Sequence, residues 1–238
     1  MNRRALKRRV HHLLMHTGYK DLPAELSVYQ VKPLINTLFP LLCSLDDTIR
    51  WHAISALGIA TAGLAEANLE EARTVMRRYI WMLNDESGGI GWGIPEAMAE
   101  SIVRSEVLAH EYLHLLISYA LADGPERFQD GNFLELPRLQ RGVLWGLLRV
   151  APNYAETLAC GGLAESLGYY LSSSDAHVVG LAVKICAALK LAPAYRAQIA
   201  PYLHTCTEFD YYHEGVIYRQ SIAAAAEKAL ASSPEDRS

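Results

Sequence analysis

The chain has 238 residues, of which 51% are hydrophobic and 20% are charged, and its formal net charge is −4. No apolar run approaches the roughly 20 residues that a membrane helix needs, so we expect a soluble cytoplasmic protein without a membrane span. Residues 1–20 hold six Lys or Arg and no acid, which leaves 16 basic and 26 acidic side chains for residues 21–238. Nucleic acid is therefore not an expected partner, because DNA binding depends on cationic contacts to phosphate.

Residues 1–20 are expected to form a basic N-terminal helix. His11, His12 and His16 interrupt the apolar stretch that a secretory signal would need. A basic run of this kind is most often a solvated helix face, or it pairs with the protein's own acidic surface. Docking on an acidic partner, RNA or a membrane surface stays open as the alternative.

Residues 30–232 repeat one helical pattern, with apolar residues at intervals of three and four. Five segments align without gaps, and their first residues are 41, 49, 39 and 39 positions apart. They are "IRWHAISALGIA" (49–60), "IGWGIPEAMAES" (90–101), "LQRGVLWGLLRV" (139–150), "VVGLAVKICAAL" (178–189) and "IYRQSIAAAAEK" (217–228). A helix pair with its turns occupies roughly 40–47 residues in HEAT-type arrays, so each segment predicts the second helix of a hairpin.

A first helix is expected before each aligned segment. The five ranges are 31–43, 68–84, 107–121, 153–171 and 194–206. The clearest unit is "LLCSLDDTIRWHAISALG", in which Asp46 or Asp47 can cap the second helix. Small residues follow at Ala53, Ala56 and Gly58, and they would let neighbouring helices approach closely.

This pattern resembles HEAT-like repeats, including the short bacterial repeats first described in phycobilisome lyases. The glycine-tryptophan turn and the stretch "DGNFLE" are similar to an uncharacterised bacterial HEAT-like family. The resemblance implies an all-α fold, an α-α superhelix of about five helical hairpins and an N-terminal helix, in a single domain over residues 1–238. Proteins of this kind mostly grip protein partners on a concave surface, so it also implies a non-enzymatic scaffold with a protein partner and no cofactor.

The stretch "NDESGGIGWGIPEAM" (84–98) places Gly89 and Gly91 where the other units turn. It has no GK[ST] sequence and no preceding strand, which excludes a Walker loop and a dinucleotide fingerprint. Trp92 begins the following helix, and Glu96 lies one turn later on the same face. We interpret this stretch as a recognition patch; the alternative is a tight turn with Trp92 in the core.

The third position of the aligned segments carries large or charged side chains in four of five cases. The residues there are Trp51, Trp92, Arg141, Gly180 and Arg219. Trp and Arg concentrate binding energy at interfaces, so we expect this column to line the concave groove, with Trp145 continuing the Arg141 face. The partner is also expected to touch the 84–95 turn and the 122–136 loop, which contains Asn132. The alternative is that the column packs against the first helices.

Two enzymatic readings compete with the scaffold. The sequence His110-Glu111-x-x-His114 is the zincin pattern, and Glu135 is available as a third ligand. Zincin-type proteases hold this helix beside a β-sheet, and no sheet is readable in the sequence, so we expect no metal site.

The second enzymatic reading comes from HEAT-like alkylpurine DNA glycosylases, whose groove is lined by Trp, Arg and one acid. Trp92, Glu96 and Arg141 match that set in part. Glu stands where that family uses Asp, and the acidic body suits DNA poorly. A pigment or cofactor lyase role is an alternative of similar weight. His213-Glu214 resembles the His-Glu pairs that bind two irons in deoxyhypusine hydroxylase, but the matching positions are Trp51-His52, Trp92-Gly93 and Arg141-Gly142, so that set is missing and the reading is excluded.

Overall fold

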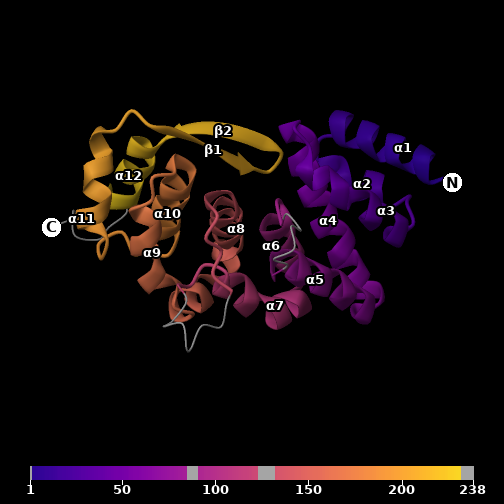
Figure 1. The fold of residues 1–238 in the computed structure, drawn as a ribbon, viewed down its shortest axis with the longest axis horizontal. Coiled ribbons are helices and arrows are strands. Elements are labelled where there is room, and N and C mark those ends of the chain that lie inside the picture. The colour runs from indigo at the N-terminus through magenta and orange to yellow at the C-terminus, as the bar shows by residue number, and fades with distance from the viewer. Residues whose placement is uncertain (1, 85–90, 123–131, 232–238) are drawn as a thin grey trace. The chain divides into compact units, whose positions relative to one another are not determined.

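The computed structural model describes residues 2–84, 91–122 and 132–231. Helices form most of these residues, which confirms the all-α class (Figure 1). Contacts divide the chain into two compact units: Met1–Leu113 with Tyr212–Val216, called the first unit, and His114–Tyr211 with Ile217–Ser238, called the second unit. Among the helices of the described ranges, none combines the length and apolar character that crossing a bilayer requires.

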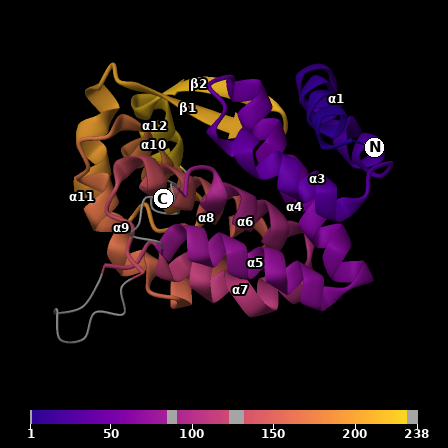
Figure 2. The same ribbon diagram turned by 45° about the vertical axis from the view of Figure 1, so that its right-hand side comes forward.

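Helix α1 (Arg3–His16) belongs to the packed core of the first unit. Its N-terminus is capped by Asn2, whose Oδ1 accepts a hydrogen bond from the Arg4 amide at 2.8 Å. The apolar residues of α1 recur at intervals of three and four and are buried against α3 (Val31–Leu38) and α4 (Asp47–Ala67); they are Leu6, Val10, Leu13 and Leu14. Figure 2 shows α1 beside α3. The apolar face of α1 is therefore packed against the unit, and the basic residues of the helix lie on its exposed face.

Helix α4 is the centre of the first unit. Asp46 caps it as predicted, since its Oδ1 accepts a hydrogen bond from the Ile49 amide at 3.0 Å. The helix packs against α3, α5 (Leu69–Asn84) and α6 (Ile94–Arg104). Shorter elements complete the unit: η1 (Tyr19–Asp21), α2 (Leu22–Leu26) and η2 (Phe39–Cys43). Helix α7 (Glu106–Ser118) follows α6, and its residues up to Leu113 belong to this unit.

Helix α10 (Ala176–Ala188) has the same central place in the second unit. It packs against α8 (Pro137–Cys160), α9 (Leu163–Leu171) and α12 (Ile222–Ala231). The predicted helix over 153–171 is instead divided between α8, which is distorted at Tyr154 just after Pro152, and α9, which begins after Gly162. Proline removes a helical amide donor, and glycine at φ 85° ends the helical backbone, so both breaks have local causes. Two short elements, α11 (Arg196–Ile199) and η4 (Ala200–His204), replace the expected helix over 194–206.

The expectation of a helix from residue 217 is wrong. Residues Glu208–His213 (β1) and Val216–Ser221 (β2) form a two-stranded hairpin, and α12 begins only at Ile222. Glu214 and Gly215 both have positive φ, 44° and 90°, which suits the two-residue turns that match the strand twist. The strands are rich in aromatic and β-branched residues, which favour extended backbone. Arg219 therefore lies on a strand and not on a second helix.

Replacing Gly58 of α4 by alanine is expected to destabilise the protein by about 1–3 kcal/mol, through overpacking. A methyl group there would lie 2.4 Å from Cβ of Glu100 on α6. Gly63 is the matched control on the same helix, because no atom lies within 4 Å of its added methyl. Gly63→Ala should raise stability by up to about 1 kcal/mol, since alanine restricts the unfolded chain and favours helix. The two urea midpoints, measured against the parent protein, test this; a similar shift for both variants would contradict the close approach.

Candidate functional site

Trp51 of the predicted column lies flat against Tyr212 within the first unit. The two rings are stacked, with centroids 4.3 Å apart and an angle of 4° between planes. Tyr212 is only 3% exposed, and its Oη lies 3.5 Å from Ser55 Oγ. Burial raises the pKa of Tyr212 to about 12, so this phenol stays neutral at physiological pH. Trp51 itself is partly exposed, so Tyr212 supports one side of an indole that still reaches the surface.

The glycine turn before α6 is described from Gly91 onward, and Gly89 lies outside the described residues. The Gly91 carbonyl accepts a hydrogen bond from the Ile94 amide at 3.1 Å. Gly93 is the position that requires glycine, because its φ is 77° and an added Cβ would lie 3.1 Å from Leu42 Cβ. Trp92 and Glu96 are both partly exposed at the start of α6. Their role in recognition stays a prediction.

Arg141, near the start of α8, holds the N-terminus of α10 through Asp175. Its Nε lies 3.0 Å from each oxygen of that carboxylate, and Nη2 also contacts Asp175. Asp175 Oδ1 accepts hydrogen bonds from the amides of His177 at 3.0 Å and Val178 at 3.2 Å. Burial opposes ionisation of Asp175, but the hydrogen bond from Arg141 and those amides lower its pKa overall. The Arg141 side chain remains 42% exposed, so its outer edge is accessible.

The other predicted residues of the second unit have different environments. Trp145 is only 4% exposed and packs in the core, so it does not extend the Arg141 surface. Asn132 donates a hydrogen bond from Nδ2 to Ser118 Oγ at 3.1 Å. Arg219, on β2, has its Nε 3.3 Å from Asp210 Oδ1 and 3.7 Å from Glu208 Oε2. The cation at 219 is thus matched by two carboxylates.

Glu111 of the zincin-like sequence is paired with an arginine. Arg73 of α5 donates from Nε to Glu111 Oε2 at 2.9 Å and from Nη2 to the other oxygen. The hydrogen bond from Arg73 lowers the pKa of Glu111, while His110 and His114 are exposed on α7. Within the ranges that the structure describes, no three His, Cys, Asp or Glu residues come together as metal ligands. Glu111 thus joins α7 to α5 through an ion pair.

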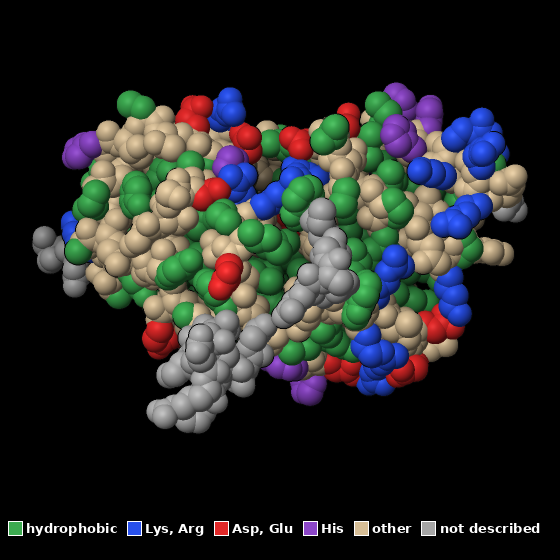
Figure 3. Space-filling model, in the orientation of Figure 1, with side chains coloured by type: hydrophobic (Ala, Val, Ile, Leu, Met, Phe, Trp, Pro, Cys, Tyr) green, Lys and Arg blue, Asp and Glu red, His purple; other side chains and the backbone are tan. Residues whose placement is uncertain are grey.

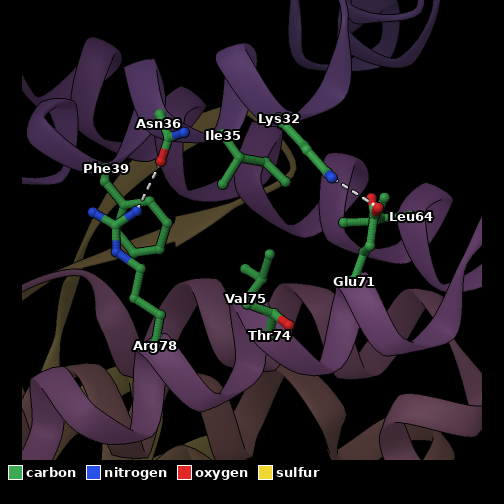
Figure 4. A pocket seen from close by; sticks show the side chains of 9 residues that line it. All are labelled: Lys32, Ile35, Asn36, Phe39, Leu64, Glu71, Thr74, Val75 and Arg78. Carbon is green, nitrogen blue, oxygen red and sulfur yellow. Dashed lines mark hydrogen bonds and ion pairs between the residues drawn. The ribbon is translucent and has the colours of Figure 1, made fainter.

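A pocket that the sequence did not predict lies between α3, α4 and α5, with a volume of about 250 Å³. Nine residues line it: Lys32, Ile35, Asn36, Phe39, Leu64, Glu71, Thr74, Val75 and Arg78 (Figure 4). Its floor is made of four buried apolar side chains, those of Ile35, Phe39, Leu64 and Val75. These residues come from three helices and from η2, so no spacing along the chain reveals them together.

Polar side chains occupy the two ends of this pocket. At one end the Arg78 guanidinium lies 3.6 Å from the centroid of the Phe39 ring and donates to Asn36 Oδ1 at 3.0 Å (Figure 4). At the other end Lys32 Nζ lies 2.8 Å from Glu71 Oε1. The pocket therefore has an apolar middle, a cationic end and a neutralised end.

Two further hollows lie in the first unit. An apolar pocket of about 330 Å³ between α2, α3 and α4 shares Leu64 with the pocket of Figure 4. The other is open and lies along α1, where Figure 3 shows basic and histidine side chains gathered. Its lining is mostly basic or histidine: Arg8, Arg9, His12 and His16, beside Glu25 and Tyr29. The ring centroids of His12 and His16 are 4.4 Å apart.

No protein-family model and no curated protein matches the sequence. Solved structures of repeat proteins match nearly the whole chain. A designed armadillo repeat protein is 14% identical, with a TM-score of 0.55 over 97% of this chain and 94% of that one. A second, solved in complex with the peptide (KR)4, is 15% identical, with a TM-score of 0.57 over 95% and 90%. An engineered protein is 16% identical, with a TM-score of 0.52 over 98% and 96%. At such identities the likeness shows the fold alone: an all-α superhelix of helical repeats, the class that the HEAT-like pattern predicted.

Proposed function

We propose that the chain is a non-enzymatic binding module that takes up an extended segment of a protein partner. The observation that carries this proposal is the partly exposed indole of Trp51, supported by Tyr212 at 4.3 Å, at the column position of a second helix. Repeat folds of this class expose long surfaces that suit extended partners. One structural neighbour was solved with the peptide (KR)4, which fits this mode of binding.

The binding residues that we propose follow the aligned column and its turns. In the first unit these are Trp51 and Trp92, with Glu96 one turn beyond and Gly91 in the preceding turn. In the second unit, Arg141, Arg219 and Asn132 would contribute polar contacts. Gly89 belongs to the proposed surface on sequence grounds. Aromatic anchors would provide most of the affinity, since large rings dominate interface energetics.

We further propose that the bound segment is basic. Residues 21–238 carry ten more acidic than basic side chains. The two arginines of the column already have carboxylates beside them, since Arg141 pairs with Asp175 and Arg219 lies near both Glu208 and Asp210. Complementary charge would draw a Lys- and Arg-rich segment to the surface, and added salt would weaken it.

The direct test is fluorescence anisotropy with labelled (KR)4 and with an acidic peptide of the same length. The parent protein should bind (KR)4 at least tenfold more tightly than the acidic peptide. Trp51→Ala should weaken (KR)4 binding at least fivefold, because it removes an aromatic anchor. Trp81→Ala is the matched control, since Trp81 on α5 is 63% exposed and lies outside the proposed surface.

A general attraction between an acidic protein and a basic peptide would leave both tryptophan variants equal to the parent. That result would reject the aromatic surface, and equal binding of the acidic peptide would reject the proposed partner chemistry. Trp51→Ala also removes the stacking partner of Tyr212, so the helix content of each variant should be compared with the parent by circular dichroism. Unchanged helix content would show that the loss of binding does not come from unfolding.

The zincin-like sequence offers a separate test of the non-enzymatic assignment. Because Arg73 lowers the pKa of Glu111 below its usual 4.5, the pair stabilises the fold above that pH, and the stabilisation is lost as pH falls through the folded-state pKa. We expect Glu111→Gln to lower the urea midpoint at pH 7, and we expect this difference from the parent protein to shrink as the pH is lowered below 4.5. Glu106→Gln, an exposed change on the same helix, is the control and should show a smaller difference at pH 7.

Zinc should leave the parent midpoint unchanged in the same experiment. A zinc-dependent rise that disappears in Glu111→Gln or in a His110→Ala, His114→Ala double variant would restore the metalloenzyme reading. A difference between Glu111→Gln and the parent that persists unchanged to pH 3 would contradict the assignment of the carboxylate to Arg73.

A further inference from the structure

We infer that the pocket between α3, α4 and α5 binds a small aliphatic monocarboxylate, with its carboxylate at Arg78 and its chain across the apolar floor. The inference is independent of the proposed peptide surface, because it concerns a different set of residues in the first unit. It stands on the size of the pocket, on the chemistry of its floor and on the difference between its two ends.

The size of the pocket suits a short chain. A volume of about 250 Å³ is larger than the roughly 150 Å³ that holds benzene in an engineered apolar cavity. A carboxylate with about eight carbons is of the right order. Ile35 and Val75 face each other across the middle of the pocket (Figure 4), and both are almost fully buried. A chain between them would replace water with apolar contacts.

Arg78 provides the anion site. Its guanidinium is held against Phe39 at 3.6 Å and by one hydrogen bond to Asn36, which together restrict its position. No carboxylate of the described residues forms an ion pair with it. A guanidinium has five donors in a planar fork, so most of them remain for a carboxylate, which it can bind through two hydrogen bonds. Partial burial lowers the pKa of Arg78, and a bound anion would offset this loss of hydration.

The opposite end determines the direction of the ligand. Glu71 places a carboxylate there, already neutralised by Lys32 at 2.8 Å. A second carboxylate at that end would have to compete with Glu71 for the Lys32 ammonium, which is unfavourable. The Thr74 hydroxyl is engaged as well, since it donates to the Glu70 carbonyl at 3.0 Å and accepts from Arg77. The favourable orientation therefore has the head group at Arg78 and the chain end near Leu64.

The experiment is a titration of the full chain with octanoate, followed by NMR shifts of the Ile35 and Val75 methyl groups. Saturable one-site binding is expected, with 1-octanol and octylamine at least tenfold weaker because neither supplies an anion. Acetate should also be at least tenfold weaker, since it lacks the chain. Arg78→Leu should weaken octanoate at least tenfold, and Arg78→Lys should weaken it less, because lysine keeps the charge but loses the planar fork.

The matched control is Arg77→Leu. Arg77 is the adjacent residue of α5, but it is engaged with Glu70 at 2.8 Å and does not line the pocket. This variant should bind octanoate within twofold of the parent. A Val75→Phe variant, which fills the cavity, should abolish the methyl shift at Ile35. Equal binding of octanol and octanoate, an equal loss in Arg77→Leu, or no saturable binding would each overturn the inference.

Discussion

The close approach of α4 to α6 at Gly58 is the constraint on which the first unit depends. An added methyl group would lie between 2.4 and 2.9 Å from Cβ, C and O of Glu100, so α4 and α6 can approach this closely only because residue 58 has no side chain. The Glu100 side chain is almost fully buried, and Arg104 one turn later forms an ion pair with its carboxylate. Arg104 also donates from Nη2 to Tyr19 Oη at 2.9 Å. Arg104 thus joins the buried carboxylate of α6 to η1.

In the second unit a glycine of the central helix also permits a close contact, here with an aromatic ring. An added Cβ at Gly180 of α10 would lie 2.4 Å from the ring of Phe209 on β1, so the absence of a side chain there leaves room for this ring. Phe209 is almost fully buried, so the hairpin strand is anchored by its apolar side chain. The aligned column therefore has two roles. At 51 and 141 it carries large side chains that remain partly accessible, and at 180 it carries glycine that admits a strand residue.

The sequence predicted what depends on local periodicity and capping. Apolar spacing located α4, α5, α6, α7 and α10 closely, and the cap at Asp46 followed from its position before the apolar run. The same alignment does not predict the hairpin, because the run of alanines after Ser221 fits the helical pattern and the turn at Glu214-Gly215 precedes it in the chain. The stacking of Trp51 on Tyr212 joins residues 161 positions apart. The repeat alignment compares equivalent positions and does not predict a contact between these two residues. The pocket is equally hidden, since its lining is assembled from separate helices.

The arginines of α5 show why charge counts alone do not locate a site. Arg73 is engaged with Glu111 and Glu70, and Arg77 is engaged with Glu70, so both cations have carboxylate partners. Arg78 follows directly in the sequence, yet the turn of the helix directs it toward Phe39 and Asn36. A ring and an amide oxygen hold a guanidinium in place but do not neutralise it. Position on the helix, and not residue type, therefore separates an arginine that joins helices from one that can accept an anion.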